Sequence, residues 1–79
     1  MDVRFFAGAA EAAGASVICV DADGLTGQDL VELLGQGNDR LSRVLQVSTL
    51  LADGVRVADL DLALRGVASV DVLPPFAGG

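Results

Sequence analysis

The last seven residues of the chain are the ones whose types and spacing could do chemistry. They read Leu73-Pro74-Pro75-Phe76-Ala77-Gly78-Gly79. The two prolines have no N–H group to donate to a sheet ladder, so they end any strand before them and favour an extended chain. The two glycines have no Cβ, so only backbone has to pass through a narrow channel. The pattern predicts a C-terminal carboxylate that is presented to the active site of another protein, rather than the frayed end that most chains have.

The rest of the sequence offers no self-contained active site. There is no histidine, and Cys19 is the only cysteine, so neither an internal disulfide nor a Cys/His zinc cluster can form. The spacing of the carboxylates from Asp21 to Glu32 is similar to that of a calcium-binding loop. However, Leu25 and Thr26 occupy the positions where a ligand and a glycine are needed, so calcium could not be coordinated. We therefore predict no metal site and no cofactor, with the chemistry in the tail or in a partner.

The length and the charge of the chain exclude several classes of protein. The chain has 79 residues, which make one domain, and a net charge of −6. All five cations are arginines, and this balance argues against nucleic acid and anionic membrane as partners. No apolar run is long enough to cross a bilayer. Because the N-terminus also lacks a basic segment, we expect no signal peptide and a cytoplasmic location.

Alternating apolar residues and turn signals predict five strands, at residues 2–7, 15–20, 49–52, 55–57 and 69–73. In the first strand, Val3 and Phe5 share one face, and Phe6 lies on the other. Residues 8–14 are expected to form a turn or a loose helical connection. Asp53-Gly54 is a strong hairpin signal.

Two helical segments lie between the second and third strands. Thr26 and Asp29 nearly match a capping box, which predicts a helix that ends at residues 35–37. Its apolar face should hold Leu30, Leu33 and Leu34. A shorter helical turn is expected to begin at Asn38 or Asp39. In the connection 59–66, the leucines should tuck under the sheet; they are Leu60, Leu62 and Leu64.

This order of elements predicts an α+β domain at residues 1–73, with a mixed sheet and one main helix packed on one face. An extended tail should follow at residues 74–79. Because the first and last strands both carry alternating apolar residues, the economical arrangement pairs them in the middle of the sheet. That arrangement is the ubiquitin-like β-grasp.

The two ends of the sequence resemble the small, sulfur-carrying subunit of molybdopterin synthase. The resemblance lies in Val3-Arg4-Phe5-Phe6-Ala7 and in Val72-Leu73-Pro74-Pro75-Phe76-Ala77-Gly78-Gly79. In three places the chain departs from that family. Phe76 replaces the usual valine, Ala10-Glu11-Ala12 replaces an arginine before a turn, and Arg65-Gly66-Val67-Ala68 replaces an acidic turn.

The resemblance implies a sulfur-transfer mechanism in which Gly79 is the residue that enters the catalytic step. An ATP-dependent, ubiquitin-activating-like adenylyltransferase would adenylate Gly79, and a sulfur donor protein would convert it to a thiocarboxylate. In the large synthase subunit, the sulfur would then pass to a cyclic pyranopterin precursor of the molybdenum cofactor. The chain would be a sulfur-donating subunit with no activity alone.

The resemblance and the strand parity together give a set of expected partner-binding residues. They are Phe6, Leu73, Pro74, Pro75, Phe76, Ala77 and Gly78. Three other functions fit the same tail: a sulfur carrier for thiamine, cysteine or tRNA thiolation, a protein modifier, or an interaction domain with an inert tail. The sequence has no lysine, so a modifier of this kind could not be extended into chains through its own lysines.

Overall fold

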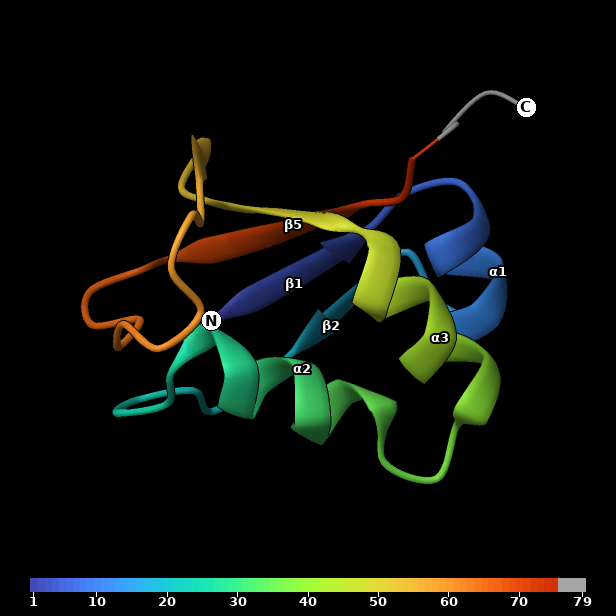
Figure 1. Cartoon of the computed structure of the whole chain (residues 1–79), viewed down its shortest axis with the longest axis horizontal. Coiled ribbons are helices and arrows are strands. Elements are labelled where there is room, and N and C mark those ends of the chain that lie inside the picture. Colours follow the sequence, from blue (N-terminus) through green and yellow to red (C-terminus); the bar gives the residue numbers. More distant parts are fainter. Residues whose placement is uncertain (76–79) are drawn as a thin grey trace.

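A mixed sheet forms the centre of the molecule (Figure 1). The computed structural model describes residues 1–75, in which the strand order is β2-β1-β5-β3-β4. The strands are β1 (Asp2–Phe5), β2 (Val17–Cys19), β3 (Thr49–Ala52), β4 (Val55–Arg56) and β5 (Ser69–Leu73). The first and last strands, β1 and β5, are parallel neighbours in the middle, and the other neighbours are antiparallel. The predicted β-grasp arrangement is confirmed.

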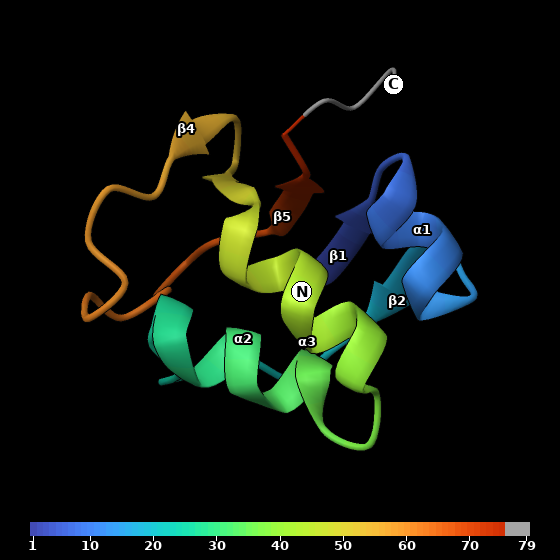
Figure 2. The same ribbon diagram turned by 45° about the vertical axis from the view of Figure 1, so that its right-hand side comes forward.

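Three helices accompany the sheet within residues 1–75. They are α1 (Gly8–Ala13), α2 (Gly27–Gly35) and α3 (Asp39–Val47). Figures 1 and 2 show α2 and α3 on the same side of the sheet. The connection after β1 contains a true helical segment, α1. The expected short turn after α2 is instead α3, a helix of nine residues, the same length as α2.

Side chains near the helix starts explain where α2 and α3 begin. The predicted capping box is present, because Thr26 Oγ1 accepts from the Asp29 N–H and Asp29 Oδ2 accepts from the Thr26 N–H, both at 3.1 Å. Asn38 caps α3 by accepting from the Leu41 N–H at 3.0 Å. Its amide also donates to the Ala12 carbonyl at 2.8 Å, which ties α3 to α1.

The core lies between the sheet and the helices. Val3, Val70, Val72 and Leu30 have no exposed surface, and burial of each contributes about 1.5–3 kcal/mol to folding. They pack in one apolar cluster with other buried side chains, among them Phe5, Leu34, Leu41, Leu45 and Leu50. The alternation predicted for β1 and β5 therefore turns one face of both strands toward the helices and leaves the other face open.

Three leucines do not lie where the sequence predicted. Leu33 is 40% exposed, at the edge of the buried stripe of α2. Leu60 and Leu62 are exposed, and only Leu64 reaches the core. The reason is that their segment does not run under the sheet. Its carbonyls at residues 60 and 62 instead accept the Gln28 and Gly27 N–H groups, so this segment caps the start of α2.

Candidate functional site

The central strand β5 leads directly into the C-terminal segment. Val70 and Val72 anchor it in the core, so its opposite face carries Ser69, Asp71 and Leu73. The strand ends at Leu73, immediately before the two prolines, as predicted. Pro74 is half-buried and Pro75 is exposed. The predicted site residues Phe76, Ala77, Gly78 and Gly79 lie outside the described residues.

Phe6 lies at the base of the tail. Phe5 is opposite Val72 in the parallel β1–β5 pair, so the carboxyl ends of both strands lie side by side. The Phe6 N–H donates to the Val72 carbonyl at 3.2 Å. The Phe6 side chain is 40% exposed, so α1 does not fold over it. The register of the β1–β5 pair places Phe6 beside Leu73, which Pro74 and Pro75 follow in the chain. We call these four predicted partner-binding residues the tail-base patch.

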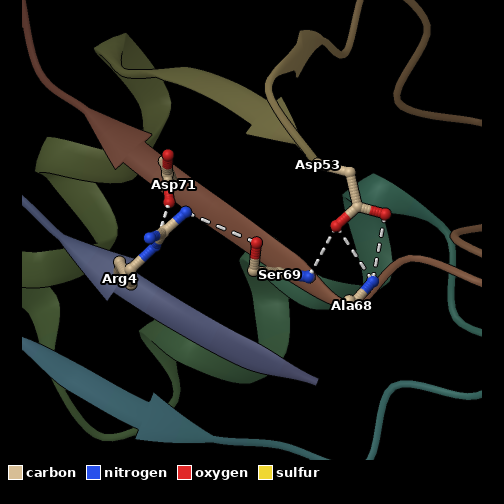
Figure 3. A network of polar contacts seen from close by, with 5 residues as sticks. All are labelled: Arg4, Asp53, Ala68, Ser69 and Asp71. Atoms are coloured by element: carbon tan, nitrogen blue, oxygen red, sulfur yellow. Dashed lines mark hydrogen bonds and ion pairs between the residues drawn. The ribbon is translucent and has the colours of Figure 1, made fainter.

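An ion pair connects β1 to β5 on the open face of the sheet (Figure 3). Arg4 Nε donates to Asp71 Oδ1 at 2.6 Å, and Arg4 Nη2 donates to Ser69 Oγ at 3.4 Å. The Arg4 side chain is half-exposed and Asp71 is largely covered. Solvent screens such a pair, so we expect it to contribute no more than about 1 kcal/mol to stability. It joins two residues that the register of the parallel strands places opposite each other, Arg4 and Asp71.

Asp53, which follows β3, binds the backbone at the start of β5 on the side opposite to β1 (Figure 3). Asp53 and Gly54 have φ values of +48° and +83°, as a tight two-residue hairpin turn requires. The Asp53 carboxylate accepts from the Ala68 N–H at 3.1 Å and from the Ser69 N–H at 2.9 Å. The Asp53 N–H also donates to the Ser69 carbonyl at 2.9 Å. The turn was predicted, but this clamp was not, because nothing in the sequence identifies a partner 15 residues away.

Asp53→Ala should destabilise the fold by about 1–2 kcal/mol, because two backbone donors lose a charged acceptor and alanine disfavours positive φ. The exposure of Asp53 keeps the expected loss at this level. Chemical denaturation measures it, with Asp61→Ala as the control, since the Asp61 carboxylate accepts no hydrogen bond within residues 1–75. Equal stability of the two variants would show that the clamp contributes nothing.

The four residues of the tail-base patch are all apolar, so the patch contains no acid, base or nucleophile. Cys19 is exposed on β2 and pairs with Asp2, at the opposite end of β1 from Phe6.

Within residues 1–75, no three His, Cys, Asp or Glu side chains are grouped so as to hold a metal ion. In the same range, no helix has the length and apolarity to cross a membrane.

Comparison with known proteins gives one family and several similar structures. The sequence model of the ThiS family matches residues 3–79. No curated protein matches the sequence. The crystal structure of SAMP1 from Haloferax volcanii is similar, with 29% identity, coverage of 100% of this chain and 98% of that one, and a TM-score of 0.72.

Two further Haloferax volcanii structures are similar to the chain. The solution structure of the HVO 2177 protein has 30% identity, covers 99% of this chain and 84% of that one, and gives a TM-score of 0.73. A crystal structure of small archaeal modifier protein 1 has 29% identity, covers 95% of both chains and gives a TM-score of 0.68.

Proposed function

The chain belongs to the ThiS family, and from this premise we propose that it is a sulfur carrier loaded at the C-terminal carboxylate of Gly79. The main support for the proposal is the position of β5 and the place where it ends. This central strand runs beside an exposed Phe6 and ends at two prolines, after which the sequence continues as Phe76-Ala77-Gly78-Gly79. The family match extends to residue 79 and so includes this segment.

The chemistry begins with a carboxylate that is a poor acyl donor. Transfer of AMP from ATP to Gly79 releases pyrophosphate and forms a mixed anhydride. A sulfide-level donor then attacks the acyl carbon, AMP leaves, and the product is a thiocarboxylate. The described part of the chain offers no side chain for these steps near the tail base, so an adenylyltransferase and a sulfur donor protein supply them.

The tail-base patch is the proposed docking surface for these partners. An aromatic side chain that is 40% exposed on a small domain is typical of a contact surface. In the proposed complex, Phe6, Leu73, Pro74 and Pro75 contact the partner, and Phe76, Ala77 and Gly78 enter its channel. The opposite side of the sheet is filled by the core and is not available.

For the sulfur acceptor, we propose a cyclic pyranopterin precursor bound by the large subunit of a molybdopterin synthase. The support is the likeness of both ends of the sequence to the small subunit of that enzyme. The sulfur would form the dithiolene of the molybdenum cofactor. A carrier for thiamine, cysteine or tRNA thiolation would be loaded by the same chemistry and would differ only in the acceptor.

A second candidate function is protein modification. It is favoured by the similarity, over the whole chain, to a protein described as small archaeal modifier protein 1. An adenylated Gly79 could equally be attacked by the amine of a substrate lysine, which would form an isopeptide bond. Because this sequence has no lysine, the modifier would be attached singly and not as a chain linked through its own lysines.

The acceptor distinguishes these functions. The thiocarboxylated protein is incubated separately with a molybdopterin synthase large subunit plus pyranopterin precursor, and with a lysine-containing protein extract plus ATP and the activating enzyme. We expect loss of sulfur from the carrier, and formation of a dithiolene, only in the first reaction. Conjugates in the second reaction, without sulfur transfer in the first, would replace the carrier proposal by the modifier.

A further inference from the structure

A groove on the side of β3 away from β5 is not used by the proposed sulfur transfer. It lies between α2, the end of α3, and the β3–β4 hairpin with the segment that follows it, and its volume is about 320 Å³. That volume is at the lower end of the range for ligand pockets. We call it the β3-edge groove. It is lined by Gln28, Val31, Leu45, Gln46, Ser48, Thr49, Leu50, Arg56, Val57, Ala58 and Leu60.

The wall of the groove includes one backbone donor of β3 that has no backbone acceptor among residues 1–75. In β3, residues 49 and 51 face β5, so Leu50 directs its backbone N–H and C=O toward β4. The Leu50 carbonyl accepts from the Val57 N–H at 2.9 Å. β4 itself is only two residues long, and within residues 1–75 the Leu50 N–H has no backbone acceptor on this side. Because Val57 already lies opposite Leu50, an extended peptide in the groove could supply this single acceptor but could not pair along β3.

The interior and the charge of the groove indicate what such a peptide would contain. Val31, Leu45 and Val57 give it an apolar floor of a size for one or two side chains. Of the lining residues, all within the described range, Arg56 alone is charged. The absence of carboxylates from this lining is notable, since the chain has 11 acidic residues and 5 arginines. Arg4 and Arg40 form ion pairs. Among residues 1–75, Arg43, Arg56 and Arg65 have no acidic partner, and of these three only Arg56 lines the groove.

We propose that the β3-edge groove binds an extended, acidic segment of a partner protein. In this segment an apolar side chain enters the groove and a neighbouring carboxylate pairs with Arg56. A backbone carbonyl of the segment accepts a hydrogen bond from the Leu50 N–H. This interaction is separate from the chemistry of Gly79 and would give the protein a second contact with one of its partners.

The test uses the full chain, labelled with ¹⁵N, and three peptides of defined sequence. The acidic peptide is acetyl-Ser-Leu-Glu-Leu-Glu-Ser-amide, and the other two carry glutamine or lysine in place of glutamate. Titration is followed through the backbone amide signals. We expect the acidic peptide to shift the signals of Leu50, Arg56 and Val57 with a Kd below about 1 mM. The glutamine peptide should bind about fivefold more weakly.

Variants of Arg56 make the test specific. Arg56→Gln should weaken the acidic peptide about fivefold, Arg56→Lys should largely restore binding, and Arg56→Glu should transfer the preference to the lysine peptide. Arg65→Gln is the control for net charge, because Arg65 is exposed and does not line the groove. It should leave the affinity unchanged.

Three results would overturn the proposal. One is the absence of groove shifts at peptide concentrations of several times the expected Kd. Another is an equal loss of affinity in the Arg56→Gln and Arg65→Gln variants, which would show an effect of net charge only. The third is an octanoate control that shifts the groove signals when the acidic peptide does not, which would assign the groove to a small amphiphile.

Discussion

Removal of Gly78 and Gly79 should abolish thiocarboxylate formation and leave the stability of the fold within about 0.5 kcal/mol of the full chain. Among residues 1–75, the buried core runs from Val3 to Val72. The two residues that are removed are glycines, which have no side chain to contribute to a core. It moves the reactive carboxylate back along the chain by about 7 Å, beyond the reach of a fixed active site. The loss of activity should be complete because the carboxylate of Gly79 is itself the group that is adenylated and then carries the sulfur.

The measurement is incubation of the truncated and full chains with the activating enzyme, ATP and a sulfur donor. Intact-mass analysis then detects the replacement of one oxygen by sulfur. Gly78→Ala is the matched variant of full length, and we expect slower loading because its Cβ must enter the partner's channel. If the truncated chain is thiocarboxylated efficiently, Gly79 is not the sulfur-bearing residue, and the proposed function is wrong.

Phe6→Ala should weaken binding to the activating enzyme and to the acceptor subunit by about tenfold or more, because exposed aromatic residues often dominate an interface. The change should cost little stability, since Phe6 is on the open face of the sheet and not in the core cluster. Titration calorimetry gives the affinity, and chemical denaturation gives the free energy of unfolding.

Leu33→Ala is the control for this prediction. Leu33 is also 40% exposed, but it lies on α2, on the helix side of the molecule. We expect its affinity for both partners to equal that of the natural chain. Unchanged binding by a stable Phe6→Ala protein would exclude the tail-base patch as the docking surface. Equal weakening by both variants would point to a general effect of apolar surface.

The local elements of this protein were determined by the sequence itself, because each depends on residues close together in the chain. Thr26 and Asp29 are three residues apart and form their capping box, and Asp53-Gly54 forms the predicted turn. Pro74 follows the last residue of β5, as expected of a residue that cannot donate to a ladder. The alternation of β1 and β5 was sufficient to predict the open position of Phe6 and the central pairing of these strands.

Contacts between distant residues were decided only by the tertiary structure. Arg4 and Asp71 are 67 positions apart, and their pairing depends on the register of two parallel strands. The same holds for the Asp53 clamp on Ala68 and Ser69. Leu60 and Leu62 follow an apolar pattern, yet they are exposed because their backbone caps α2. The β3-edge groove likewise exists only where α2, α3 and β3 meet, since apolar periodicity specifies which face is buried but not which element covers it.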